Sequence, residues 1–364
     1  MANEMRVLVV GPRGISGHEG GIEKFTDEFV RRAVGVCRLS VLCLTVPPED
    51  RIPAGLELVQ VPKSSLLTTD KGMYLIWALW IYATRPIDRV LVLGTNFGGL
   101  VPLMKLMFWR RARIYLRSGS IDHVLTKWSP PVRLLLRLSE WLTRFADGVI
   151  AVSPSIQSHL TSIGIPSVLV RNGLERRPPP AAARTPGTVI AVGRITMQKN
   201  YGVLIEASAR LGKSGPAVTI VGGADLSGES DRLTDLLKAN PEARVSFVGA
   251  LPRSEVLTLL DRHALYVMCS IHEGMSNSVM EAIQQRIPII LSDIEANRDL
   301  ALPDHFYFDP NDPVALAEKI STALADPGRF VVSTEIFEDW DHVIARILNV
   351  AEITDMPSLE VVHA

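Results

Sequence analysis

The feature that most constrains the fold is a repeated alternation of short apolar segments with longer amphipathic ones. The chain opens in this way, with the apolar segment Arg6–Val10, a glycine-rich loop and an amphipathic segment at residues 22–33. Because buried strands are apolar and surface helices are amphipathic, this pattern predicts a parallel sheet covered by helices. Further strands are expected at 39–45, 56–61, 89–93, 113–116, 148–152 and 167–170, with a helix at 130–146.

A second alternation of the same kind follows a break in composition. Residues 174–187 contain three consecutive prolines, beginning at Pro178, and then three alanines. Such a stretch ends a sheet and predicts an interdomain linker. The 364 residues also exceed the length of most single compact domains, so two domains are expected. The later strands are expected at 188–192, 217–221, 245–248, 265–268 and 288–291, and helices at 201–211, 231–238, 253–261, 278–285 and 313–325.

These elements predict an α/β protein with two Rossmann-like domains. The N-terminal domain is expected at residues 1–172, the linker at 173–187 and the C-terminal domain at 188–330. Open parallel sheets bind ligands at the carboxyl ends of their strands, so the two domains are expected to face each other across a cleft. Functional motifs should then follow strands directly. The amphipathic stretch at 336–350 could pack on either domain.

Composition and targeting signals exclude several classes of protein. No long apolar region or cleavage site precedes the first loop, so the mature N-terminus is expected close to Met1. The longest apolar runs are shorter than the roughly 20 residues that cross a bilayer. The three cysteines, Cys37, Cys43 and Cys269, form no CxxC pair, and the histidines are not clustered in sequence. We therefore expect buried cysteines, a reducing cytoplasm and no zinc site.

The net charge of −1 conceals an asymmetry between the two halves. Residues 1–172 carry 21 of the 38 Lys and Arg but only 13 of the 39 Asp and Glu, which leaves 17 and 26 for the rest. Basic residues mixed with aromatic ones could meet anionic lipid or nucleic acid, or form a solvated face. We favour lipid, which predicts a cytoplasmic protein that is at most peripheral at the inner membrane face and binds no nucleic acid. The basic residues concerned are Lys105, Arg110, Arg111, Arg113, Arg117, Lys127, Arg133, Arg137 and Arg144.

The most specific motif lies at residues 272–281, where two carboxylates, Glu273 and Glu281, flank the start of a predicted helix. Gly274 allows the backbone to approach a ligand closely. Amides at a helix start favour phosphate oxygens, while Glu281 could reach a ribose diol and Glu273 could bind sugar hydroxyls. In the alternative interpretation, Ser278 and Glu281 form a capping box that only stabilises the helix. The two interpretations are compatible.

A second motif, at residues 193–200, ends the first strand of the predicted C-terminal domain. It carries two cations, Arg194 and Lys199. A diphosphate leaving group gains negative charge as its bond to the sugar breaks, and fixed cations stabilise that charge. Arg194 can hold two oxygens at once, whereas Lys199 acts as a point charge. Taken alone, both residues could instead be solvated.

A third motif, at residues 11–23, follows the first strand and includes Gly20 and Gly21. It matches neither the GxGxxG dinucleotide fingerprint nor the P-loop pattern. A dehydrogenase is therefore disfavoured. The glycines could admit a phosphate or sugar close to the backbone, or form only a flexible turn.

Together, the three motifs resemble family 4 of the glycosyltransferases, retaining enzymes of the GT-B fold, over nearly the whole chain. The resemblance rests on Glu273 and Glu281 in an E-x7-E pattern, Arg194 and Lys199, the glycine pair at Gly20, and Asn172-Gly173 before the linker. The opening loop, with Lys127 and Trp128, further resembles a bacterial branch that builds cell-surface polysaccharides and includes rhamnosyltransferases.

The resemblance implies a role for each motif. Arg194 and Lys199 would bind the donor diphosphate, Glu281 the ribose and Glu273 the transferred sugar, while Gly21 would complete the phosphate site from across the cleft. The family needs no metal-binding DxD motif, and no such motif follows a predicted strand in this sequence. The fold also implies that the C-terminal segment 331–364 crosses back to the N-terminal domain. Backbone amides of Gly274, Met275, Ser276, Asn277 and Ser278 would bind the phosphates.

The acceptor side departs from the family pattern. Many members carry a His or Asp directly after the strand expected at 113–116, whereas this chain reaches Asp122 and His123 only after Ser118-Gly119-Ser120. Either residue could assist at the acceptor or belong to an exposed helix start. The base is also open, because base selection is expected at strand ends, near Val248 or Gly222, and uridine, guanosine and deoxythymidine donors all fit.

The sequence thus predicts transfer of a sugar from a nucleotide-diphosphate sugar to a saccharide or lipid-linked acceptor, with no metal and no cofactor. Two alternatives remain. One is a GT-B sugar-nucleotide epimerase, which would need no acceptor. The other is a non-catalytic sugar-nucleotide-binding subunit, which the irregular segment around His123 would suit.

Overall fold

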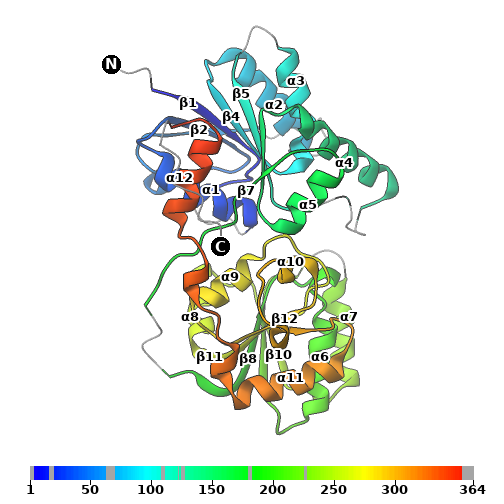
Figure 1. Cartoon of the computed structure of the whole chain (residues 1–364). Helices are drawn as coiled ribbons and strands as arrows, with labels where there is room; N and C mark the ends of the chain where they lie inside the picture. The colour runs from blue at the N-terminus through cyan, green and yellow to red at the C-terminus, as the bar shows by residue number, and fades with distance from the viewer. Residues whose placement is uncertain are drawn as a thin grey trace. The chain divides into compact units, whose positions relative to one another are not determined.

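The protein is described here by a computed structural model, in which two compact units are present. The described residues are 4–15, 20–62, 70–107, 111–121, 123, 128–178, 183–224 and 228–354, with backbone only at 70 and 71. The first unit contains residues 1–173 and 338–364, and the second contains residues 174–337. The chain therefore leaves the first unit at Gly173 and re-enters it at Glu338. The order of the elements along the chain can be followed by colour in Figure 1.

The first unit is built on a parallel sheet with the strand order β3-β2-β1-β4-β5-β6-β7. The order reverses between β1 and β4, the arrangement that creates a ligand-binding edge in open α/β sheets. The strands are β1 (Arg6–Val10), β2 (Arg38–Cys43), β3 (Leu56–Gln60), β4 (Arg89–Leu93), β5 (Arg113–Ser118), β6 (Gly148–Ala151) and β7 (Val168–Leu169). The helices are α1 (Gly21–Ala33), α2 (Asp70–Thr84), α3 (Leu100–Leu106), α4 (Pro130–Leu142), α5 (Pro154–Ser162) and α12 (Trp340–Val350).

The second unit repeats this plan with the strand order β10-β9-β8-β11-β12-β13, again all parallel. The reversal falls between β8 and β11. The strands are β8 (Thr185–Val192), β9 (Ala217–Val221), β10 (Val245–Gly249), β11 (His263–Met268), β12 (Ile289–Ser292) and β13 (Tyr307–Phe308). The helices are α6 (Tyr201–Leu211), α7 (Glu229–Ala239), α8 (Arg253–Arg262), α9 (Asn277–Gln284), α10 (Glu295–Arg298) and α11 (Pro313–Ala325).

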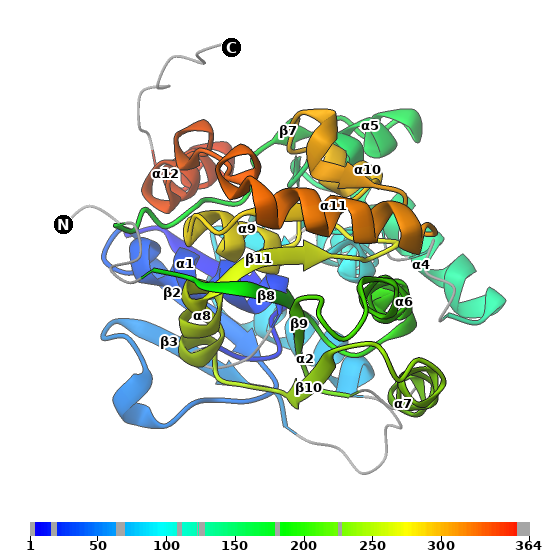
Figure 2. The same cartoon turned by 90° about the horizontal axis from the view of Figure 1, so that it is seen from below.

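Helix α12 comes from the end of the described chain but belongs to the first unit. It lies beside α1 (Figures 1 and 2), and its buried Trp340 packs against Phe25 of α1. The helix begins where Asp339 accepts a hydrogen bond from the His342 amide at 2.9 Å, a side-chain cap of the usual kind. Gly173 lies against the same helix, since a Cβ at this position would come 2.8 Å from Trp340 Cα. Helix α12 therefore packs on the first unit, whereas residues 331–337 of the segment expected to cross back belong to the second unit.

The predicted α/β fold of two Rossmann-like domains is confirmed, with differences at several elements. The helix expected at 130–146 ends at Leu142, where a 3-10 turn, Thr143–Phe145, takes over. The helix expected from 336 begins at Trp340. Strand β13 was missed because its two residues, Tyr307–Phe308, carry no periodic signal and pair only with β12.

Two other expectations concern buried and apolar segments. All three cysteines are buried, and loss of water contact raises the pKa of both Cys37 and Cys43 to about 11. The thiols therefore stay protonated at neutral pH and act as core side chains. Among the described residues, no helix combines the length and apolarity needed to cross a membrane.

Candidate functional site

The loop after β8 is shaped around Lys199. Gly193 adopts φ +155°, and the Tyr201 hydroxyl donates a hydrogen bond to its carbonyl oxygen at 2.8 Å. A 3-10 turn, Met197–Lys199, and left-handed Asn200 then lead into α6. A Cβ at Gly193 would lie 2.7 Å from Lys199 Cε. Because Gly193 has no side chain, the Lys199 side chain can lie directly against its backbone.

The structure brings this loop against the segment that carries Glu273. Lys199 Nζ lies 2.7 Å from Glu273 Oε1, and the two side chains are only 17% and 12% exposed. Two further bonds join the same loops: Gln198 Nε2 donates to the His272 carbonyl at 2.6 Å, and the Ile271 amide donates to the Gln198 carbonyl at 3.0 Å. The two motifs that follow β8 and β11 therefore form one shielded, charged centre.

Helix α9 begins one residue after Ser276, whose side chain makes no capping bond. The capping-box interpretation is therefore wrong, because Ser278 lies inside the helix and its hydroxyl accepts from the Tyr266 hydroxyl at 2.9 Å. Ser276 and Ser278 hydroxyls lie 3.1 Å apart. The first amides of an α-helix have no acceptor within the helix, so those of Asn277 and Ser278 remain suited to an anion. Met275 and Gly274 precede them in the connecting loop.

Glu281 is held by a residue that the sequence analysis did not identify. Arg253 Nε donates to Glu281 Oε1 at 3.0 Å, and the carboxylate side chain is 11% exposed. Arg253 is the first residue of α8, the helix that follows β10. In the sequence, only its position after a predicted strand could have indicated Arg253 as a site residue. Glu281 lies in the second turn of α9 rather than in the first.

Arg194 and Val248 lie at the carboxyl ends of their strands but are less enclosed. Arg194 is exposed, and its side chain has no hydrogen bond or ion pair within the described residues. Val248, near the end of β10, is 43% exposed. Gly222 lies so close to the Gly193 carbonyl that a Cβ would come within 1.9 Å of the oxygen. The contacts of Arg194, Val248 and Gly222 with a donor remain predictions.

In the first unit, Gly20 and Gly21 stand at the start of α1. A Cβ at Gly20 would lie 2.0 Å from Glu23 Oε2. The buried Glu23 carboxylate in turn accepts from Arg13 Nε at 3.0 Å, which fixes the loop to the helix. Arg13 is therefore tied to the first turn of α1, whereas residues 16–19 are outside the described residues. The loop's contact with a donor is still a prediction.

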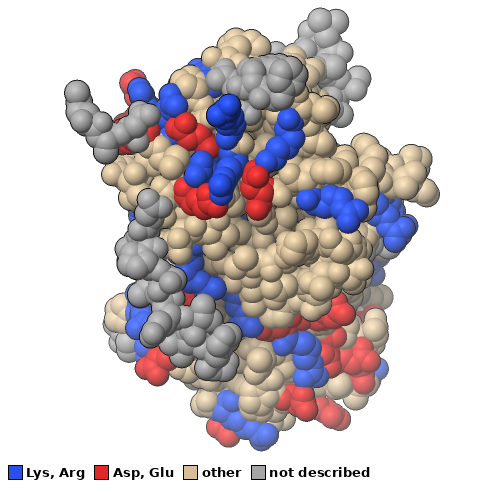
Figure 3. All heavy atoms as spheres, turned by 45° about the horizontal axis from the view of Figure 1, so that its top comes forward, with Lys and Arg blue, Asp and Glu red and all other residues tan. Residues whose placement is uncertain are grey.

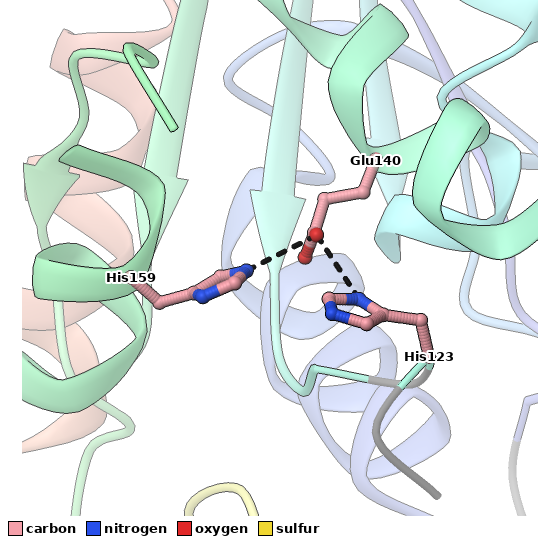
Figure 4. A group of neighbouring side chains, drawn as sticks. All are labelled: His123, Glu140 and His159. Atoms are coloured by element: carbon pink, nitrogen blue, oxygen red, sulfur yellow. Dashed lines mark hydrogen bonds and ion pairs between the residues drawn. The ribbon is translucent and has the colours of Figure 1, made fainter. Parts of the chain in front are cut away.

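His123 does not lie at an exposed helix start. It is 8% exposed, and its Nδ1 lies 3.1 Å from Glu140 Oε2, while His159 Nε2 lies 3.1 Å from the same oxygen (Figure 4). Burial lowers the pKa of His123 despite the neighbouring carboxylate. The surface interpretation is wrong for His123, and two histidines distant in sequence are in fact clustered. Asp122 lies outside the described residues.

The basic surface expected in the first half is less continuous than its composition suggests. Arg117 is buried, donates to Asn172 Oδ1 at 2.6 Å, and has its pKa lowered to about 9 by loss of solvent. Lys105 pairs with Asp147, and Arg113 pairs with Glu352. On the face drawn in Figure 3, basic and acidic side chains are interspersed. Arg133, Arg137 and Arg144 remain exposed on and after α4, whereas Arg110 and Lys127 are outside the described residues.

A cavity of about 460 Å³ lies elsewhere in the second unit. It is lined by residues near the amino ends of β8, β9 and β10, among them Thr188, Ala217 and Arg244. Lys199 and Glu281 follow the carboxyl ends of their strands, so this cavity is not part of the candidate site.

A comparison with protein families finds a match within the second unit. Residues 175–335 match the family model described as glycosyl transferases group 1. This range contains Lys199, Glu273 and Glu281 together with the strands that position them. This part of the chain is therefore similar to group 1 glycosyl transferase domains.

Two curated relatives illustrate the range of similar proteins. The glycogen synthase of Mycobacterium tuberculosis (strain CDC 1551 / Oshkosh) is 28% identical over 204 residues, which cover 52% of this chain and 48% of the relative. The amylovoran biosynthesis glycosyltransferase AmsD of Erwinia amylovora is 26% identical over 262 residues, covering 68% of this chain and 70% of the relative. The matched region thus spans about half the length of the glycogen synthase.

Solved structures resemble nearly the whole chain. Sucrose-phosphate synthase from Thermosynechococcus elongatus superimposes with a TM-score of 0.80 at 17% identity, covering 96% of this chain and 98% of that one. Anabaena HepE in complex with UDP and glucose gives 0.73 at 18% identity, covering 96% and 99%. At 17% and 18% identity, the likeness shows the fold alone. It confirms the GT-B fold of two Rossmann-like domains.

Proposed function

We propose that this protein is a retaining glycosyltransferase that moves a hexosyl unit from a nucleotide-diphosphate sugar to a saccharide or lipid-linked acceptor. The product would be a cell-surface polysaccharide or glycolipid, as the rhamnosyltransferase-like resemblance suggests. The observation that carries the proposal is the shielded Lys199–Glu273 pair, 2.7 Å apart, next to the start of α9. It lies within the residues matched by the glycosyl transferases group 1 model.

Each group at this centre has a defined role in the proposed reaction. As the sugar–phosphate bond breaks, the diphosphate gains negative charge, which Lys199, Arg194 and the first amides of α9 stabilise. Because Lys199 is partly shielded from water, its charge acts more strongly than one in bulk solvent. Glu273 accepts hydrogen bonds from the transferred sugar while its partner Lys199 binds phosphate. Protein cations would thus take the part that a metal plays in other transferases.

The donor's ribose and base are assigned to neighbouring residues. Glu281, held by Arg253, would accept the ribose hydroxyls, and the strand ends at Val248 and Gly222 would meet the base. The bound UDP in the similar Anabaena HepE structure makes uridine donors the first to test. Gly20 and Gly21 would approach the phosphates, and Asp122 would assist at the acceptor.

The test is a comparison of Lys199→Ala with Lys213→Ala. Lys213 lies in the same unit but is 75% exposed, and it pairs with Glu242 at 3.4 Å. We expect Lys199→Ala and Glu273→Ala to reduce donor turnover by about 10²- to 10³-fold, measured over a panel of sugar nucleotides, while Lys213→Ala keeps its activity. Near-normal turnover in both folded site variants would refute the assignment.

Product analysis in the same assay separates the alternatives. An epimerase would convert the donor without acceptor, whereas a transferase yields free nucleoside diphosphate together with a glycosylated product. A binding subunit would show calorimetric donor affinity without turnover across a broad acceptor panel. We propose the transferase because the matched domain family is that of glycosyl transferases.

We further propose that α4 attaches the protein to the inner face of the cytoplasmic membrane. Its outer face is apolar, with Leu134 and Leu135 exposed by 69% and 63%. Arg133 and Arg137 are exposed on the same helix, and the Arg144 guanidinium lies over the Trp141 ring at 4.8 Å. Apolar and aromatic side chains beside arginines suit an interface with anionic lipid. A lipid-linked acceptor would be reached there.

A further inference from the structure

Three side chains from separate elements of the first unit converge on one point. His123 follows β5, Glu140 lies near the end of α4, and His159 lies on α5, and all three point toward one another (Figure 4). Both imidazoles contact the same carboxylate oxygen, each at 3.1 Å. One potential ligand atom from each residue lies within 4.8 Å of the others. Two of the chain's eight histidines thus meet at one carboxylate.

The hydrogen bonds within this cluster leave one buried oxygen atom of Glu140 without a partner among the described residues. The Glu140 side chain is 4% exposed, and its second oxygen, Oε1, is buried without a hydrogen-bond partner among the described residues. Leaving an acceptor of a buried carboxylate unsatisfied costs folding free energy. A further electron-pair acceptor in the cluster, bound by the carboxylate and both rings, would remove that cost.

The nearest cations do not fill this role. Arg133 Nε donates to the His123 carbonyl at 3.2 Å rather than to the carboxylate. No hydrogen bond joins Arg137 to Glu140 within the described part of the chain. Both arginines are exposed on α4, so solvent and salt screen their repulsion of a cation inside the cluster.

We propose that His123, Glu140 and His159 bind a divalent transition-metal ion, with Zn²⁺ as the best match. Two imidazole nitrogens and one carboxylate oxygen are a donor set that zinc accepts, with a fourth position left for water. Around a tetrahedral ion with bonds of about 2.0–2.1 Å, ligand atoms stand roughly 3.3 Å apart. The observed contacts of 3.1 Å are close to this spacing, so ring rotations and a small displacement suffice. His159, 23% exposed, gives the ion access from solvent.

The ion would join the segment after β5 to α4 and α5. It lies in the first unit, whereas Lys199 and Glu273 lie in the second. The inference therefore does not depend on the proposed sugar transfer, and its test needs no enzymatic assay.

The first measurement uses the full-length protein without an affinity tag, stripped with a chelator and then titrated with Zn²⁺. We expect one equivalent to bind, the melting temperature to rise with added Zn²⁺, and Co²⁺ to give the visible absorption of a tetrahedral site. Binding of no zinc by the stripped wild-type protein would overturn the proposal without any variant.

Variants then locate the site. His159→Gln and Glu140→Gln keep side-chain size and should weaken Zn²⁺ binding by about 100-fold or more. His342→Gln is the matched control, because His342 also contacts a carboxylate, Asp339 at 2.8 Å, but lies on α12 and is exposed. Circular dichroism verifies folding of each variant. Equal Zn²⁺ affinity in the wild type and a folded His159→Gln variant would show that the metal binds elsewhere.

Discussion

Lys199 Nζ lies 2.7 Å from Glu273 Oε1, and its aliphatic stem fills the space beside Gly193. The position of the cation thus depends on a residue that has no side chain. The ion pair therefore depends on the backbone of the loop at Gly193. A substitution of Gly193 can disturb the ion pair while both charged side chains remain present.

Gly193→Ala is expected to displace Lys199. The new Cβ would lie 2.7 Å from Lys199 Cε and 3.0 Å from the Tyr201 hydroxyl. Because the end of a lysine is flexible, the lysine moves and the ion pair with Glu273 lengthens. A misplaced catalytic group costs on the order of 10²-fold in rate, so donor turnover should fall by about that factor, with weaker calorimetric donor binding.

The control for this substitution is Gly212→Ala, which also has a positive φ, +72°, but has no atom within 4 Å of the new Cβ. Both variants should lose about 1–3 kcal/mol of stability from backbone strain. Only Gly193→Ala should lose activity. Equal activity of the two variants would show that the position of Lys199 is not critical.

Leu134→Glu tests attachment through α4. The wild-type protein is expected to sediment with anionic liposomes at low salt and to be released as salt screens the attraction. The exposed leucine can be replaced without opening the core, but a carboxylate there would be repelled by the lipid, so the bound fraction should fall several-fold. Val314→Glu, at a 43% exposed position of α11, is the control. Absence of wild-type binding at low salt would remove the proposed attachment.

Asp88→Asn is expected to make stability less dependent on pH. Asp88 accepts from the Arg6 amide and side chain at 2.9 Å, and the Arg6 guanidinium lowers the pKa of this carboxyl. A lowered pKa stabilises the fold above the ordinary carboxyl pKa of about 3.9, and this contribution is lost as pH falls through the folded pKa.

Urea unfolding of the wild type and Asp88→Asn should therefore differ at pH 7 and converge in acid, below about pH 4. Asp235→Asn, in an exposed pair with Lys238 at 2.8 Å, should change little at either pH. A difference between wild type and Asp88→Asn that stays constant into acid would contradict the assigned cause.

Gly173→Ala is expected to loosen α12. Its Cβ would lie 2.8 Å from both Cα and the backbone nitrogen of Trp340, so backbone has to move. Overpacking of this kind costs roughly 1–3 kcal/mol, measurable by urea unfolding. Gly119→Ala, in the same unit but with no atom within 4 Å, should change stability by less than about 0.5 kcal/mol. A smaller effect at Gly173 than at Gly119 would contradict the packing argument.

The sequence predicts central strands well because their burial is visible as uninterrupted apolar residues. Three of them, Arg6–Val10, Arg89–Leu93 and Ala217–Val221, have the expected bounds. Strand β7, expected at 167–170, retains only Val168–Leu169, since its length depends on pairing with β6 rather than on its own composition. Pairing partners lie far away in sequence and leave no local pattern.

In the candidate site, too, contacts between residues far apart in sequence could not be predicted. The sequence places Lys199 and Glu273 after strands, but their ion pair spans 74 residues and is visible only in three dimensions. Arg253 was missed because a first-turn arginine after Pro252 looks like a solvated residue. His123, Glu140 and His159 follow no ligand spacing, since each comes from a different element.

Because α12 belongs to the first unit, the two units are not completed in the order in which their first residues are synthesised. A ribosome makes residues 174–337 before Trp340, Val343 and Ile347, which complete the core around Phe25 and Phe29. Until translation reaches α12, the nascent first unit leaves that apolar surface uncovered, while the second unit already has all its strands. The unit synthesised first is thus the one completed last.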